Sequence, residues 1–164
     1  MEPVIISISK YKMALLSEIY KNPKIVEAIA SQQDGVIPDE PDSLMYKNLF
    51  PYLRIPGTEK DTDTYVLLKV DKDRVNRNNR VYSRYQTTMW ALAHQDRMQM
   101  DARFNATRID YIAEELTRMF HGQQRFGFSK FELISDMEVI LDTKYLYREL
   151  VFRCNDLRQP IAQW

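Results

Sequence analysis

A strongly amphipathic segment, TRIDYIAEELTRMFHG at residues 107–122, separates two pairs of strand-like segments. Thr107 and Asp110 have the spacing of a helix capping box, with Asp in place of the usual Glu. Gly122 is expected to end this helix, because glycine is common just beyond a helix C-terminus. The apolar residues of the segment recur at helical spacing and form one stripe: Ile109, Ile112, Leu116, Met119 and Phe120. The sequence therefore predicts one helix between two hairpins.

The first hairpin is predicted from TYVLLKV and VYSRYQTTMWALAH, which are rich in β-branched and aromatic residues. A turn centred on Arg77–Asn78 would place Val70 opposite Tyr85. The residues near this turn, DKDRVNRNNR, are polar on both faces. We therefore expect a long hairpin that projects beyond the core.

The second hairpin is predicted from KFELISDMEV and YLYRELVFRCND, with Asp142–Lys144 as the turn. Cys154 is the single cysteine, so an internal disulfide is excluded and a small buried thiol is expected. Alternation predicts one core face in each strand: Phe131, Leu133, Met137 and Val139 in the first, and Leu146, Leu150, Phe152 and Cys154 in the second.

The N-terminal part is expected to hold two short helices and then a less regular stretch. In the first helix, Met13, Leu16, Ile19 and Tyr20 have helical spacing. A second helix restarts in NPKIVEAIAS, where Asn22 can cap and Pro23 fits the first position. Residues 32–43 are acidic and contain prolines, which predicts a loop. Residues 44–58, broken by two prolines, predict an irregular apolar segment with room for one helical turn.

These elements predict a single α+β domain over residues 1–164, with a mainly antiparallel sheet of four strands, or slightly more, and helices packed on it. Within it, residues 1–31 hold the N-terminal helices and residues 32–63 the irregular segment. Residues 64–157 form the hairpin–helix–hairpin core, and residues 158–164 a C-terminal tail. The outer strands of such a sheet leave edges that must be covered or paired.

Composition excludes several classes of protein. The chain has 23 Lys and Arg and 23 Asp and Glu, a formal net charge of zero, whereas a polyanion-binding protein usually carries a basic surplus. We therefore expect no sequence-specific nucleic acid as a partner. No stretch approaches the roughly 20 apolar residues that span a membrane, and the N-terminus does not resemble a secretory signal. A soluble protein of a reducing interior, with no membrane partner, is the expectation.

The stretch AHQDRMQMDARFNATRID, residues 93–110, is the best candidate for chemistry. The sharpest hypothesis is a metal held by His94, Asp96 and Asp110, as in a small metal-dependent nuclease. However, the ligand spacing of a zinc motif is missing, and Asp110 has a local role at a helix N-terminus. We therefore expect no catalytic residue, no cofactor and no metal ion. The same stretch contains Met98, Met100 and Phe104, which suit a contact surface in an exposed loop.

The tip of the first hairpin is a second candidate contact. Asp71 and Asp73 have the spacing of a calcium loop, but no Glu closes a coordination sphere. Arg74, Arg77 and Arg80 make the tip basic, so a phosphate or an acidic protein surface could meet it. A merely solvated tip is the alternative.

The order of these motifs resembles a known family. A long hairpin ending in H-x-D, RIDYI opening a helix, GFSKFELIS and YLYRELVFRCNDL occur in this sequence in that order. This pattern resembles the tail terminator (tail-completion, or neck) proteins of tailed bacteriophages over about residues 46–158. The residues that carry it are Arg108, Asp110 and Ile112 at the helix start, Phe131 to Leu133 on one strand, and Arg148 to Asp156 on the last.

The resemblance implies a structural virion protein without catalytic activity. Such proteins form a ring, usually a hexamer, on the last ring of the tail tube, where they end tube polymerisation and meet the head-side connector or stopper protein. The implied partners are copies of the chain itself, the tail tube protein and that connector, in the virion neck, assembled in the host cytoplasm. DNA would pass through the ring. The candidate assembly contacts are Arg74, Arg77, Arg80, Met98, Met100 and Phe104.

The sequence leaves three alternatives open. A head-side stopper or adaptor of the same neck is the nearest. A small metal-dependent nuclease would need a bound divalent ion. An ordinary cytoplasmic interaction module would bind no particle component.

Overall fold

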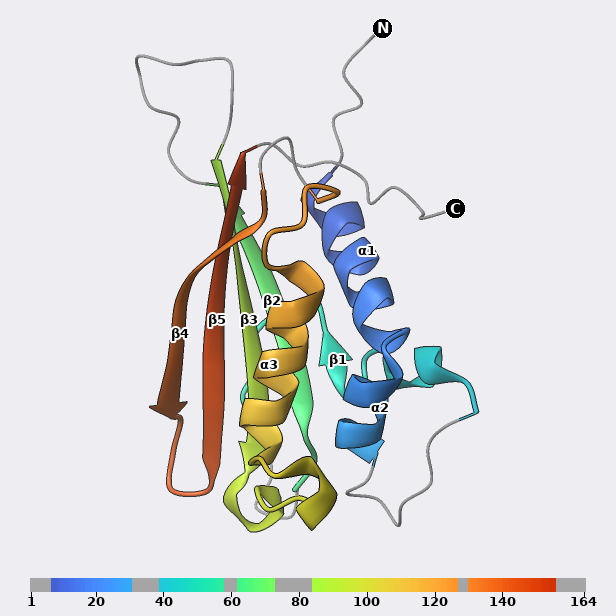
Figure 1. Cartoon of the computed structure of the whole chain (residues 1–164), viewed down its shortest axis with the longest axis vertical. Coiled ribbons are helices and arrows are strands. Elements are labelled where there is room, and N and C mark those ends of the chain that lie inside the picture. The colour runs from blue at the N-terminus through green and yellow to red at the C-terminus, as the bar shows by residue number, and fades with distance from the viewer. Residues whose placement is uncertain (1–6, 31–38, 58–61, 73–83, 127–129, 156–164) are drawn as a thin grey trace, which may run out of the picture.

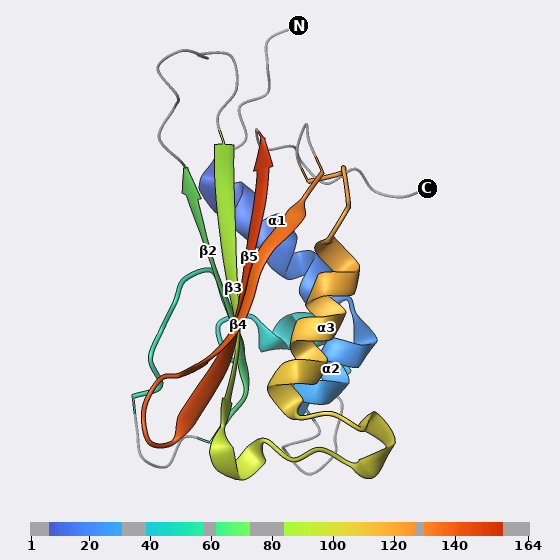
Figure 2. The same ribbon diagram turned by 60° about the vertical axis from the view of Figure 1, so that its left-hand side comes forward.

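Five strands form one sheet in the order β1-β2-β3-β5-β4 (Figure 1). The computed structural model describes residues 7–30, 39–57, 62–72, 84–126 and 130–155. In these residues the strands are β1 (Leu49–Phe50), β2 (Tyr65–Lys72), β3 (Arg84–His94), β4 (Glu132–Ile140) and β5 (Tyr145–Asn155). Helices α1 (Ile8–Tyr20), α2 (Pro23–Ala30) and α3 (Arg108–Phe120) lie together on one face (Figure 2). The predicted single α+β domain is confirmed.

The helix boundaries follow the predicted local signals. Asn22 Oδ1 accepts a hydrogen bond from the Lys24 backbone N–H at 3.0 Å, and α2 begins at Pro23. Thr107 Oγ1 accepts one from the Asp110 N–H at 3.4 Å. Gly122 adopts a φ of 78° just beyond α3, a conformation that glycine tolerates well. None of the described helices is long and apolar enough to cross a membrane.

The first hairpin exists, but its predicted register is wrong. Val70 pairs with Thr87 and Lys72 with Tyr85, so the pairing is shifted by two residues from the expected one. A shift of two keeps every side chain on its face, and the predicted core side is therefore unaffected. The hairpin tip, with Arg74, Arg77 and Arg80, lies outside the described residues.

The second hairpin contains an irregularity that the sequence pattern did not predict. The register between β4 and β5 shifts between Leu133 and Ser135. The extra residue moves the rest of β4 to the opposite alternation, so Met137 and Val139 lie opposite Glu149 and Tyr147 on the sheet face away from the helices. The prediction that Met137 and Val139 share the face of Phe131 and Leu133 is therefore wrong. The prediction for β5 is confirmed, since Leu150, Phe152 and Cys154 are buried in the main core and Leu146 packs against it.

Strand β1 was not predicted. It pairs with β2 in parallel, with Leu49 opposite Val66 and Phe50 opposite Leu67. The buried Asn48 holds β1 beside β2, because its side-chain amide donates to the Thr64 carbonyl at 2.9 Å. A strand of two residues is too short to show the alternation of apolar and polar residues that predicts a strand. Its pairing also depends on β2, which follows later in the chain. A 3₁₀ turn at Pro41–Leu44 lies mostly in the predicted loop of residues 32–43, before the segment in which a helical turn was expected.

The main core lies between the sheet and the helices. Its aromatic end contains Phe131 and Phe152, whose rings stack at 4.9 Å, and the hydroxyl of buried Tyr11 donates to the Phe126 carbonyl at 3.0 Å. Cys154 is buried there, as predicted. Met13 does not join this core despite its helical spacing and is 39% exposed. Met13 lies outside the buried face of α1, which contains Tyr11 and Leu15.

A smaller cluster lies on the other face of the sheet. Phe50, Tyr65, Leu67, Leu92 and Tyr145 are buried there. The segment after β1 runs over this face on the side away from the helices (Figure 2), and its Leu53 packs on the cluster.

Candidate assembly surfaces

The stretch around His94 folds as two 3₁₀ turns, Gln95–Arg97 and Ala102–Phe104, between β3 and α3. His94 is 4% exposed, and its Nδ1 accepts a hydrogen bond from the Asp96 N–H at 3.1 Å. Its ring meets Tyr145 edge to face, with 5.0 Å between ring centroids. His94 therefore caps a turn. Within the described part of the chain, no group of three or more His, Cys, Asp or Glu residues is arranged to hold a metal ion.

Arg108 is a buried cation that ties α2 to this stretch. Its guanidinium donates from Nη1 to the Ala28 carbonyl in the last turn of α2, and from Nε to the Arg97 carbonyl at 2.7 Å. Burial lowers the pKa of Arg108, and the nearby charge of Arg97 lowers it further. A cation is favourable at a helix C-terminus, where carbonyl groups lack partners. Arg108 therefore positions the segment that precedes α3.

Asp110 and Arg148, two residues that carry the sequence resemblance, are in direct contact. Arg148 on β5 donates from Nη1 to Asp110 Oδ1 at 2.8 Å and from Nε to Asp136 Oδ1 on β4 at 2.6 Å. The hydrogen bond to Asp136 is the main cause of a raised pKa of Arg148. Asp110 also lies in the first turn of α3, where negative charge is favoured. One arginine thus joins the helix to both strands of the second hairpin.

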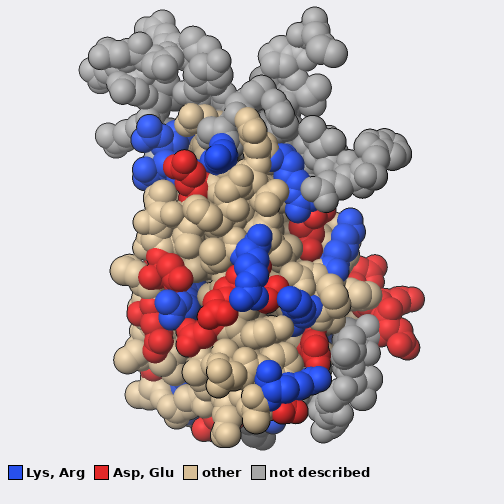
Figure 3. Space-filling model, viewed as in Figure 1, with Lys and Arg blue, Asp and Glu red and all other residues tan. Residues whose placement is uncertain are grey.

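A groove of about 520 Å³ lies beside this bridge, between α3 and β4. Small residues, Ala106 and Ala113, line it together with charged ones. Its charges are matched locally, for example by Arg118 and Glu114 at 3.6 Å. Figure 3 shows acidic and basic side chains alternating over this side of the molecule. The groove therefore offers no single-sign binding site, but it leaves the helix-facing side of β4 uncovered.

The predicted contact residues of the loop are less exposed than expected. Met100 is only 9% exposed and belongs to the main core, and Met98 and Phe104 are partly buried against it. The ring of Phe104 packs edge to face on Tyr111, with 4.9 Å between centroids. The exposed position expected for these side chains is therefore wrong, because the Arg108 N–H bonds to the Met98 carbonyl at 2.9 Å and folds the loop inward. Their part in assembly stays a prediction.

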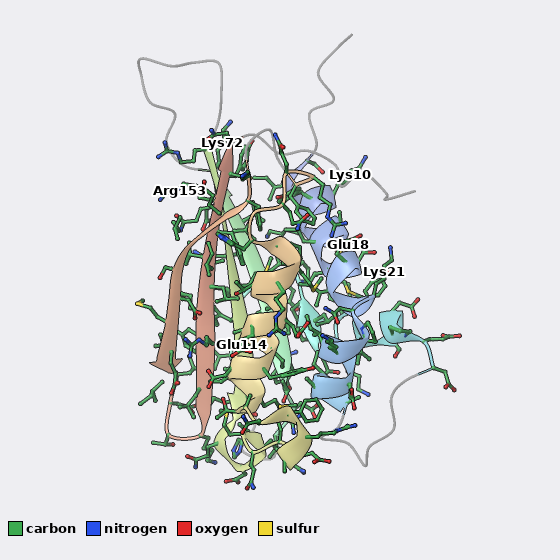
Figure 4. The ribbon with its side chains drawn as sticks, in the orientation of Figure 1. Lys10, Glu18, Lys21, Lys72, Glu114 and Arg153 are labelled. Atoms are coloured by element: carbon green, nitrogen blue, oxygen red, sulfur yellow. The ribbon has the colours of Figure 1, made fainter. Side chains whose placement is uncertain are left out.

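The base of the first hairpin is basic in the described residues. Figure 4 shows Lys72 at the end of β2 and Arg153 near the end of β5 at the same end of the sheet. Arg84 begins β3 there and is exposed. These cations extend the basic character that the sequence gives to residues 74–80.

Sequence reasoning missed the most exposed apolar side chains. In the described residues the large hydrophobic side chains that are exposed are Met13, Tyr46, Tyr52, Ile55, Ile134, Met137 and Ile140. For β4 the sequence carried only part of the signal: ELISDMEVI has apolar residues at both odd and even positions, whereas its place at the sheet edge comes from the structure. A strand with one solvated face would alternate.

Comparison with known proteins now identifies the family. The YomW family model matches residues 15–154, which is most of the chain. The chain belongs to the YomW family. Its fold is similar to that of a chain in a structure described as "Virion of native gene transfer agent (GTA) particle", with a TM-score of 0.55 and 10% sequence identity. The likeness covers 88% of this chain and 92% of that chain. No curated protein matches the sequence significantly.

Proposed function

We propose that this YomW-family protein is a structural protein of a phage-like virion and, more specifically, a tail terminator. It forms a ring, by the family resemblance a hexamer, at the head-proximal end of the tail tube. There it ends tube polymerisation and joins the tail to the head-side connector. The neck of the virion is its place, and DNA passes through the ring.

The observation that carries the proposal is the fold likeness to a chain of a gene transfer agent virion. It extends over 88% of this chain and 92% of the other, so it concerns the whole domain. The sequence resemblance to tail terminators is independent of that comparison and narrows the role. Its residues Asp110 and Arg148 form one contact in the structure, so part of the resembling pattern maintains the fold.

A structural role also suits the candidate site. His94 is 4% exposed and its Nδ1 caps a turn, and Asp110 pairs with Arg148, so both side chains have roles in the fold. Apolar side chains are exposed at both sides of the sheet, as expected for a subunit that is covered by neighbours in an assembly. These observations support assembly over catalysis.

The experiment is removal of the protein from the particle that encodes it, followed by electron microscopy. We expect overlong tails and filled heads without tails, with wild-type protein restoring normal particles. Tails of normal length that fail to join heads would favour the alternative, a head-side stopper or adaptor of the neck. Normal tails joined to heads would overturn both assignments.

A further inference from the structure

The exposed apolar side chains of the described residues fall into two sets on different parts of the sheet. One set lies on β4, the outer strand at one edge. The other lies on α1 and in residues 45–57, around β1 at the opposite edge. Figure 1 shows β4 and β1 on different sides of the ribbon. The segments that carry the two sets differ in charge: β4 contains acidic residues, whereas residues 45–57 contain basic ones.

The first set, which we call the β4 patch, consists of Ile134, Met137 and Ile140 with Glu132 and Glu138. The three apolar side chains are 44%, 53% and 72% exposed. Because of the register shift, Met137 projects on the face away from the helices and Ile140 on the helix face, opposite Leu146. An edge strand with exposed apolar groups on both faces is suited to insertion into a partner surface. Within β4 there are three acidic residues and no Lys or Arg.

The second set, which we call the β1 patch, consists of Met13, Tyr46, Tyr52 and Ile55 with the basic residues Lys47 and Arg54. Residues 45–57 contain these two cations and no Asp or Glu. The guanidinium of Arg54 lies 4.6 Å from the centre of the Phe50 ring, so its charge is held against β1. Lys47 is exposed beside Tyr46.

Tyr46 is an exposed aromatic residue of this patch with an unusual backbone conformation. It is 57% exposed, yet its φ is 59°, a left-handed conformation that is unfavourable for a bulky side chain. Its N–H bonds to the Leu49 carbonyl at 2.8 Å, and its ring meets Phe50 edge to face. Its hydroxyl lies 3.9 Å from the sulfur of Met13. The backbone of Tyr46 is strained while its exposed ring contacts Phe50 and Met13, and such strain is often found at binding surfaces.

We propose that the β4 patch of one copy docks on the β1 patch of the next. The partner is a second copy of this chain, because both surfaces belong to one chain, both are apolar, and their own segments, β4 and residues 45–57, carry opposite charges. Contacts between unlike surfaces at different edges repeat head to tail and close into a ring when the rotation fits. The interface thus deepens the proposed function and rests on it for the ring. Side-chain contacts dominate the interface, since the register shift and the acidic residues of β4 disfavour plain strand pairing.

A cross-linking experiment tests the pairing directly. Glu138→Cys and Lys47→Cys variants are purified, mixed, and treated with a short thiol-to-thiol reagent; the native Cys154 is buried and provides little background. We expect cross-linked pairs in the mixture, a ladder of multimers from the double variant, and monomers from either single variant alone. An absence of cross-linked product in the mixture would overturn the proposal. Cross-linking of either single variant with itself would also overturn it, because it would mean that like surfaces meet.

Charge reversal provides the second measurement, by sedimentation velocity. Glu138→Lys and Lys47→Glu should each weaken self-association by about tenfold or more, and the double variant Glu138→Lys with Lys47→Glu should recover it. Lys21→Glu, the same reversal outside both patches, is the matched control and should change nothing. Equal behaviour of the control and the two single variants, or no recovery in the double variant, would contradict the pairing.

The cross-linking and charge-reversal results can be distinguished from a failure of the proposed tail-terminator function. Particles that assemble normally without the protein would remove the neck role, while the cross-links would still establish the interface. Overlong tails without the protein, combined with no cross-link, would keep the role and remove this interface.

Discussion

At the scale of single residues, side chains that look reactive in the sequence have bonding partners within the fold. Asp110 accepts from Arg148 at 2.8 Å while lying in the first turn of α3, and both groups are about one-third exposed. Asp110→Ala should therefore lower the free energy of unfolding by only about 0.5–1 kcal/mol, through the lost dipole and ion-pair contacts. Urea denaturation measures this change. Elemental analysis is the control, and a stoichiometric metal ion lost on substitution would contradict the structural role.

Asp142 gives a pH-dependent prediction at the same scale. Its Oδ1 accepts from the N–H groups of Lys144 and Tyr145, at 2.7 and 2.8 Å, and these bonds lower its pKa below the ordinary 3.8. A carboxyl with a lowered folded pKa stabilises the protein above its unfolded pKa, and the contribution is lost as the pH falls through the folded pKa. Wild type should therefore lose part of its stability below about pH 4.

Asp142→Asn separates this carboxylate from the turn itself. The amide oxygen of Asn can accept the same two hydrogen bonds but does not titrate. Thermal melts should show wild type more stable than Asp142→Asn at neutral pH, with the difference shrinking as the pH falls below about 4. A difference that stays constant over that range would mean that the charge is not the cause.

At the scale of elements, the loop between β3 and α3 illustrates a surface expectation that packing reverses. Because Met100 is 9% exposed and part of the main core, Met100→Ala should cost about 2 kcal/mol or more through the cavity that it leaves. Met13→Ala, at a methionine that is 39% exposed, is the matched control and should change stability by less than about 0.5 kcal/mol. Equal small effects at both positions would restore the view of Met100 as a surface contact.

The elements also show which parts of the fold are readable from sequence. The boundaries of α2 and α3 were predicted because Asn22, Thr107 and Gly122 act on backbone groups within a few residues. The faces of β4 were not, because one extra residue near Ile134 reverses the alternation without changing the apolar composition. Strand β1 was missed because a parallel pair with β2 is determined by distant residues.

Among the candidate surfaces, too, some could be predicted from the sequence and others could not. The basic tip was visible in composition, since Arg74, Arg77 and Arg80 stand out without any fold. The β4 and β1 patches were not, because exposure of Met137 or Tyr46 depends on which residues the helices and the register shift leave uncovered. From the sequence alone, apolar residues such as these are predicted to lie in the core. Only the structure shows that no described residue covers them.

At the scale of the whole molecule, the first hairpin is predicted to act in assembly and not in folding. Within the described residues the pairing of β2 with β3 runs as far as Lys72 and Tyr85, and Asp71 and Lys72 are exposed at that end. Replacing residues 73–84 with Asn-Gly links the two paired residues by a favoured hairpin turn. The melting temperature should stay within a few degrees of wild type, while attachment to tail or head components should weaken.

A length-matched variant separates the charge of the hairpin from its reach. Arg74→Gln, Arg77→Gln and Arg80→Gln together keep all residues of the segment but remove three positive charges. If an acidic partner surface is recognised, this variant should bind as weakly as the shortened one, and binding by wild type should fall with added salt. If only the shortened variant fails, the length of the hairpin makes the contact. A parallel loss of melting temperature and attachment on shortening would instead mean that the hairpin packs on the core and contributes to folding.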